Sequence, residues 1–85
     1  MLIVWDRDAK KVLKKMDKTT ANRIVSKVEQ LANDESSLAQ NITPLKGLPD
    51  TYRLRVGDWR VIYRFENGHL VLLVLKIGAR GSVYR

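Results

Sequence analysis

The stretch that decides the fold is TYRLRVGDWRVIYRF, which runs from Thr51 to Phe65. Apolar and polar residues alternate on both sides of Gly57-Asp58, a pattern typical of two strands joined by a tight hairpin. Glycine in the first position of a two-residue loop suits a type II′ turn. Because such a turn fixes the register, Arg55 is predicted to lie opposite Arg60.

This register divides the hairpin into two faces, because directly opposed residues share a face of the sheet. The apolar face, which we expect the helices to cover, holds Tyr52, Leu54, Val56, Trp59, Val61, Tyr63 and Phe65. The other face holds Arg53, Arg55, Arg60, Ile62 and Arg64. Like charges directly opposite one another destabilise a sheet by roughly 0.2–1 kcal/mol. We interpret that cost as the sign of a bound anion; neutralisation by Asp50, Asp58 or Glu66 is the structural alternative.

A third strand is predicted to follow the hairpin, from His69 to Ile77. Asn67-Gly68 is the favoured signal for a type I′ turn. Counting through this turn places Trp59 opposite Lys76 and Arg60 opposite Leu75. Apolar residues point to both faces, which is typical of a strand inside a sheet. Of these, Leu70, Leu72 and Val74 are expected to face the core, and Val71, Leu73, Leu75 and Ile77 the other side.

The N-terminal half predicts a strand and two helices. Leu2 to Trp5 is a short apolar run, and Asp6 can cap the helix that follows. The first helical face holds Ala9, Val12, Leu13 and Met16 at helical spacing. A second helix is predicted to start between Asp17 and Thr20, and its apolar stripe is Ala21, Ile24, Val25, Val28, Leu31 and Ala32.

The second helix is predicted to end at the polar run 33–37, and residues 40–50, with two prolines and a glycine, to form a loop. The resulting order is β-αα-βββ. We therefore expect one α+β domain over residues 1–85, with a helical hairpin packed on one face of a mostly antiparallel sheet.

The charge of the chain favours a polyanion or an acidic protein as its partner. The 85 residues carry a formal net charge of +7. Residues 1–35 hold eight basic and six acidic groups, whereas residues 36–85 hold eight and three, so the excess lies in the second half. A merely cationic soluble surface is the alternative. The lysines at positions 10, 11, 14 and 15 form either a solvated helix face or a contact with a nucleic acid backbone.

Several classes of function find no support in the sequence. There is no cysteine, and hence no disulfide or thiolate metal site, which fits a reducing cytoplasm. No signal peptide is expected, and the run LVLLVL is far too short to span a membrane. His69, the one histidine, is expected to be a solvated turn residue. No metal-ligand spacing or nucleophile-base pattern is present.

The arginine face suits phosphate chemistry. Guanidinium groups bind phosphate through paired hydrogen bonds, stay protonated, and can stabilise the charge of a pentacoordinate phosphorus. Arg80 lies five residues beyond Leu75, and Gly78 and Gly81 permit a bend that returns it toward Arg55 and Arg60. Tyr84 and Arg85 follow it. An RNA site and a site for an acidic peptide are both compatible with this arrangement.

The segments LKGLPDTYRLRVGDWRVIYRF and VLLVLKIGARGSVYR resemble the RelE branch of the RelE/ParE toxins. The resemblance covers nearly the whole chain, and the spacing L-x-G-x-x-x-x-Y-R-x-R-x-G-x-x-R-x-x-Y is its most specific part. It implies a ribosome-dependent endoribonuclease that cleaves messenger RNA in the A site without a metal or other cofactor. It also implies a cognate antitoxin, operator DNA bound only through the toxin-antitoxin complex, a cytoplasmic location and no membrane partner.

The same resemblance implies roles for individual residues. Arg53 and Arg55 match the family's basic pair, Arg60 the arginine that opens the next strand, Arg80 the late arginine, and Tyr84 the C-terminal tyrosine. These residues would hold the scissile phosphate and assist attack by the 2′-hydroxyl, with Arg55, Arg60, Arg80 and Tyr84 as catalytic residues. Arg53, Arg64, Lys46 and Arg85 are expected to bind RNA.

Two alternatives of other classes remain beside this expectation. One is a ParE-like toxin that inhibits DNA gyrase and breaks no bond itself. The other is a non-catalytic basic module whose arginines only hold an antitoxin or RNA.

Overall fold

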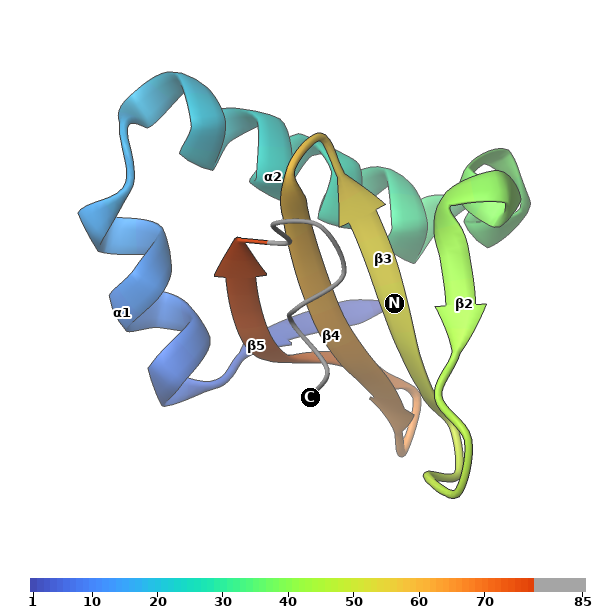
Figure 1. The fold of residues 1–85 in the computed structure, drawn as a ribbon. Helices are drawn as coiled ribbons and strands as arrows, with labels where there is room; N and C mark the ends of the chain where they lie inside the picture. Colours follow the sequence, from blue (N-terminus) through green and yellow to red (C-terminus); the bar gives the residue numbers. More distant parts are fainter. Residues whose placement is uncertain (78–85) are drawn as a thin grey trace.

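Residues 1–77 form five strands, two α-helices and a 3₁₀ helix, in an order close to the predicted one (Figure 1). The computed structural model describes the backbone of residues 1–77 and the side chains of residues 1–34 and 36–73. The elements are β1 (Leu2–Trp5), α1 (Arg7–Lys15), α2 (Lys18–Asn33), η1 (Glu35–Asn41), β2 (Ile42–Pro44), β3 (Thr51–Val56), β4 (Trp59–Glu66) and β5 (His69–Ile77).

The strands form one sheet in the order β1-β5-β4-β3-β2. β1 pairs with β5 in parallel, and the other three pairs of neighbours are antiparallel. The sheet is therefore mostly antiparallel, as predicted. β5 lies between β1 and β4, which confirms that the apolar third strand of the predicted hairpin series is an interior strand.

The turns adopt the predicted types and set the predicted register of the first hairpin. Gly57 has a φ of 59°, as the first position of a type II′ turn requires, and Asn67 and Gly68 both have positive φ, as in a type I′ turn. Across β3 and β4, Arg55 pairs with Arg60, and Arg53 pairs with Ile62. The turn residues thus set the register that places the arginines of this hairpin on one face of the sheet.

The predicted register between β4 and β5 is correct only near the second turn. Glu66 to Tyr63 pair as counted, but the register then shifts, so that Ile62 lies opposite Val74 and Arg60 opposite Lys76. A bulge that inserts one extra residue into β5 causes the shift, and turn residues do not encode it. Leu70 and Leu72 are buried as predicted. The predicted faces of residues 74–77 lie outside the described side chains.

The predicted loop over residues 40–50 is partly wrong. Its first residues complete η1, and Ile42–Pro44 form the short edge strand β2, which pairs with β3 so that Thr43 lies opposite Arg53. Pro44 is compatible with a strand here because an edge strand leaves one row of its N–H groups unpaired. A strand of three residues is too short to show an alternation of apolar and polar residues, so periodicity could not predict it.

The two helices begin at the predicted polar residues. Asp6 caps α1 by accepting a hydrogen bond from the backbone N–H of Asp8, and Asp17 caps α2 by accepting one from the N–H of Thr20. The hydrogen bonds of Thr20, first from its hydroxyl and then from its N–H, lower the pKa of the Asp17 carboxyl below its ordinary value. No helix within residues 1–77 is long and apolar enough to cross a membrane.

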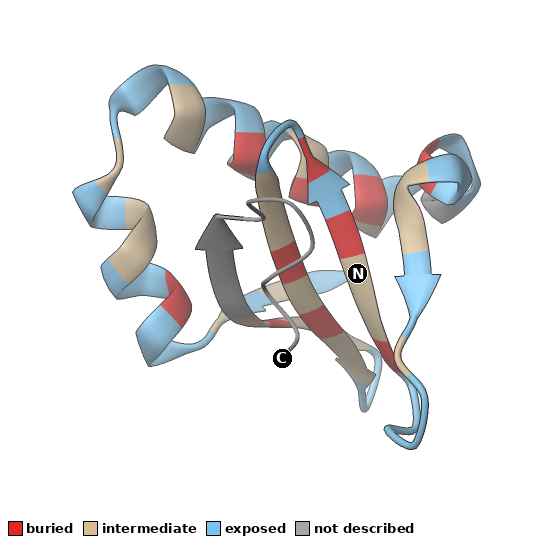
Figure 2. Ribbon diagram, viewed as in Figure 1, coloured by how far each residue is buried: buried red, intermediate tan, exposed pale blue. Residues whose placement is uncertain are grey.

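The core lies between α2 and the apolar face of the sheet (Figure 2). Ile24, Val28 and Leu31 of the predicted α2 stripe are buried, and they meet the buried face of the β3–β4 hairpin. The ring of Tyr63 is fully buried and stacks on Tyr52, with 5.5 Å between the ring centroids. Because the helices cover one face, the arginine face of the hairpin is left on the opposite side of the sheet.

Candidate functional site

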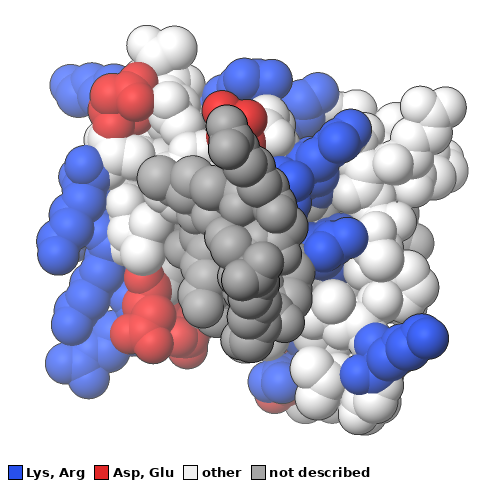
Figure 3. All heavy atoms as spheres, viewed as in Figure 1, with Lys and Arg blue, Asp and Glu red and all other residues white. Residues whose placement is uncertain are grey.

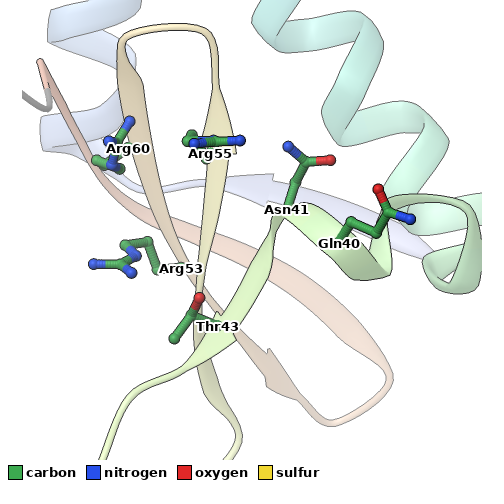
Figure 4. A pocket seen from close by; sticks show the side chains of 6 residues that line it. All are labelled: Gln40, Asn41, Thr43, Arg53, Arg55 and Arg60. Atoms are coloured by element: carbon green, nitrogen blue, oxygen red, sulfur yellow. The ribbon is translucent and has the colours of Figure 1, made fainter.

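Three of the predicted arginines line one pocket on the helix-free face of the sheet. Arg53 and Arg55 come from β3 and Arg60 from β4, and the pocket has a volume of about 220 Å³. Arg53 and Arg60 point to the same side of the hairpin, whereas Arg55 points toward Asn41 (Figure 4). The three arginines therefore share one pocket, and the turn-fixed register that predicted Arg55 opposite Arg60 is confirmed.

Three further residues complete the pocket, and sequence reasoning missed them. Gln40 and Asn41 end η1, and Thr43 belongs to β2. They supply two amides and a hydroxyl, which can both donate and accept hydrogen bonds. The β-branched pair Ile42-Thr43 was the one available signal, and Pro44 directly after it favoured a loop instead. All of the described residues that line the pocket are thus charged or polar, and none of them is apolar or acidic.

The like charges of Arg55 and Arg60 are not neutralised by the carboxylates considered above. Arg60 donates from Nη1 to the carbonyl oxygens of Gly57 and Trp59, at 3.4 and 3.3 Å, and forms no ion pair with the described side chains of residues 1–34 and 36–73. Arg55 is exposed and has neither a hydrogen bond nor an ion pair among the described residues. Asp50 and Asp58 likewise form no ion pair in this part of the chain. Among the described side chains, Arg55 and Arg60 therefore keep their positive charge without a carboxylate partner.

Arg64 lies away from this pocket and does have a carboxylate partner. Its Nη2 lies 2.7 Å from Oε2 of Glu66, and its Nε donates to the same oxygen at 2.9 Å. It lines a separate pocket of about 390 Å³ together with His69, whose Nδ1 donates to the carbonyl of Asn67. This arrangement sets Arg64 apart from the three converging arginines and leaves His69 beside its turn.

The remaining predicted residues are separate from the pocket or outside the described residues. Lys46 is exposed in the connection between β2 and β3 and does not line the pocket. Arg80, Tyr84 and Arg85 lie outside the described residues, so their predicted return toward the pocket stays a prediction. Basic side chains gather on two parts of the visible surface, one over α1 and one beside the β3–β4 hairpin (Figure 3).

The arrangement suits the recognition of an oxyanion. Guanidinium groups bind phosphate or carboxylate through paired hydrogen bonds, and they remain charged because their pKa lies above 12. Amide and hydroxyl groups beside them can bind a ribose hydroxyl, a base edge or further phosphate oxygens. Protein interfaces, in contrast, bury an apolar centre. The polar lining of the described pocket therefore suits an oxyanion, such as a phosphate or a carboxylate, better than the apolar centre of a protein interface.

Comparison with protein families gives one match that spans nearly the whole chain. A sequence model of the family described as "ParE toxin of type II toxin-antitoxin system, parDE" matches residues 3–84. No curated protein sequence matches the chain significantly.

Comparison with solved structures finds the same fold. A chain of the archaeal RelE–RelB complex from Pyrococcus horikoshii superposes with a TM-score of 0.76 at 25% identity, covering 93% of this chain and 96% of that one. A chain of the intact E. coli RelBE toxin-antitoxin complex gives 0.75 at 18% identity, with coverages of 93% and 98%. A free-state mutant of the E. coli toxin RelE gives 0.73 at 20% identity, with coverages of 98% and 88%.

Proposed function

Because this chain belongs to the RelE/ParE toxin superfamily and is a toxin of a type II toxin-antitoxin system, we propose that it acts as a ribosome-dependent endoribonuclease. Its substrate would be messenger RNA in the ribosomal A site. The observation that carries this proposal is the pocket that Arg53, Arg55 and Arg60 line together, with no carboxylate among its described lining residues. An inhibitor that only docks on a protein has no need of such a pocket.

The proposed reaction is a transfer at phosphorus. The 2′-oxygen of the ribose forms a bond with the adjacent phosphorus, and the bond to the 5′-oxygen breaks. The products are a 2′,3′-cyclic phosphate and a 5′-hydroxyl. The nonbridging oxygens gain negative charge in the transition state, and fixed cations beside them lower its free energy.

The described residues divide this work according to their positions. Arg55 and Arg60, which lie opposite one another, would bind the scissile phosphate from two sides. Arg53 would hold the phosphate or its neighbour, and Thr43, its partner in the sheet, would donate a hydrogen bond to the RNA. The arginines stabilise charge and do not remove the 2′ proton, because a guanidinium effectively never deprotonates. Arg80 and Tyr84 are proposed to complete the site.

Primer extension on messenger RNA recovered after brief expression tests this proposal. We expect cuts in phase with the A site codon, lost in Arg55→Gln and Arg60→Gln. Arg7→Gln is the matched control, because it removes the same charge from an exposed position on α1. Cuts that persist in both pocket variants would contradict the assignment of the site.

A second candidate function is inhibition of DNA gyrase, which is favoured by the description of the matching family as ParE toxins. It predicts DNA damage and no cleavage of messenger RNA after expression. Growth unaffected by expression would leave a non-catalytic module that binds an antitoxin or RNA. The same cultures therefore separate the three possibilities.

We also propose a cognate antitoxin as the protein partner. The similar RelE chains from E. coli and P. horikoshii were solved in RelBE complexes, which supports this partner. Co-expression of the protein encoded beside the toxin gene is expected to restore growth.

A further inference from the structure

A fourth arginine approaches the pocket from the helical side of the molecule. Arg23 is exposed on α2, and its guanidinium lies against Gly57 at the tip of the β3–β4 hairpin. A Cβ atom built on Gly57 would lie 3.1 Å from Nη1, 3.5 Å from Cζ and 3.6 Å from Nη2 of Arg23. Because three atoms of the group are almost equally distant, the guanidinium lies across the glycine. The missing side chain of Gly57 thus makes room for it.

Arg60 reaches the same glycine from the sheet. Its Nη1 lies 3.4 Å from the carbonyl oxygen of Gly57. The path from Arg23 Nη1 to the Cβ position of Gly57, along the bonds of Gly57 to its carbonyl oxygen, and on to Arg60 Nη1 has a summed length of about 11 Å. The two guanidinium groups therefore lie no further apart than that. Neither of them forms an ion pair with a described side chain, and Asp58, the acid of this turn, forms none either among residues 1–34 and 36–73. The turn therefore carries a second cation beside the pocket, and the one acid of the turn, Asp58, is not paired with it.

We propose that Arg23 binds a second phosphate of the RNA, next along the strand from the phosphate held by Arg55 and Arg60. This inference rests on the proposed function and adds a direction to it: the RNA leaves the pocket across the β3–β4 turn toward α2. In Figure 3, basic side chains continue from the pocket region toward the α2 side of the hairpin. A single strand carries a phosphate at every nucleotide, so one or two nucleotides span the separation of the two cations.

Arg23 is placed for this role because its guanidinium already lies against the backbone of Gly57. A long side chain that is free in solution loses rotamer entropy on binding, and packing on a backbone reduces that loss. The positive φ of Gly57 disfavours any residue with a side chain, so the turn and the arginine position depend on the same glycine.

Binding of RNA at varied salt tests the inference. The probes are an octanucleotide and a dinucleotide of 2′-O-methyl RNA, which the proposed reaction cannot cleave, and the readout is fluorescence anisotropy. Arg23→Gln is expected to weaken octanucleotide binding about fivefold, the size of one exposed charge contact. The slope of log affinity against log salt should become shallower by about 0.7, the value for one phosphate of a single strand. Dinucleotide binding should stay unchanged.

Three further variants make the result specific. Lys27→Gln removes the same charge one helical turn further along α2, and it should weaken octanucleotide binding much less than Arg23→Gln. Arg23→Lys keeps the charge and should restore the salt slope. Arg55→Gln should weaken the binding of both probes, because it alters the pocket itself.

The outcomes separate this inference from the function on which it rests. Equal losses in Arg23→Gln and Lys27→Gln, an unchanged salt slope, or an equal loss with the dinucleotide would overturn the role of Arg23. An Arg23-dependent affinity for a polyglutamate peptide but not for RNA would overturn it as well. If Arg55→Gln bound both probes as the wild type does, the proposed function would fail first.

Discussion

Replacing Arg55 by glutamine is expected to stabilise the free protein while it abolishes activity. Arg55 lies opposite Arg60, is exposed, and has no hydrogen bond or ion pair among the described residues, so the substitution removes a repulsion and no described contact. Like charges at such positions cost roughly 0.2–1 kcal/mol. For a domain of this size, each kcal/mol shifts the melting temperature by about 4–8 °C, so we expect a rise of about 1–8 °C.

The salt dependence of the melting temperature identifies the cause of the rise. At about 10 mM salt the screening length is roughly 30 Å, whereas at about 1 M it is roughly 3 Å. The stabilisation by Arg55→Gln should therefore be present at low salt and absent at high salt, as measured by circular dichroism. Arg60→Gln should give a smaller rise, because it also loses the hydrogen bonds to Gly57 and Trp59.

Lys46→Gln is the control for net charge, since it removes one exposed cation outside the pocket. It should change the melting temperature much less than Arg55→Gln. An unchanged or lower melting temperature of Arg55→Gln at low salt would refute the idea that repulsion between Arg55 and Arg60 destabilises the free protein. A rise that persists at high salt would refute it as well, because screening would then have no effect.

Four further predictions concern other parts of the fold and site. Asp17→Asn should lower the melting temperature at neutral pH, because hydrogen bonds with Thr20 lower the pKa of the Asp17 carboxyl below 3.8 and its ionised form therefore favours folding. The difference in melting temperature from the wild type should vanish as the pH falls through that lowered pKa. Thr43→Val should leave stability almost unchanged and weaken RNA binding about 2- to 12-fold in anisotropy titrations, the range for one lost hydrogen bond. Ile24→Ala, at a fully buried position, should cost about 2–5 kcal/mol in urea unfolding, against about 0.5–1.5 kcal/mol for Ile24→Val. Arg64→Gln should barely change the melting temperature, because exposed ion pairs contribute about 0–1 kcal/mol, and it should reduce cleavage far less than Arg55→Gln.

The sequence predicted the half of the site that short-range chemistry controls. Two-residue turns fix the register, so the opposition of Arg55 and Arg60 follows from Gly57-Asp58 alone. Asp6 and Asp17 likewise marked the helix starts, because capping is a local interaction. These features need no knowledge of distant parts of the chain.

The features that the sequence did not predict depend on tertiary contacts. β2 forms because Ile42–Pro44 pair with the outer edge of β3. A segment of three residues is too short to show a periodic pattern of apolar residues. Gln40 and Asn41 enter the pocket only because η1 leads into that strand. The extra residue in β5 also depends on tertiary contacts, because the packing and twist of the whole sheet determine where a bulge forms.

The shortness of β2 also bears on how this protein behaves when it is concentrated. An outer strand with a long row of unused N–H and C=O groups can recruit another copy of the same chain and begin a fibre. Ile42–Pro44 exposes only three residues on that side, and the proline ring supplies no amide hydrogen. The sheet edge beside the pocket is thus poorly suited to self-assembly, which leaves the entrance of the pocket accessible.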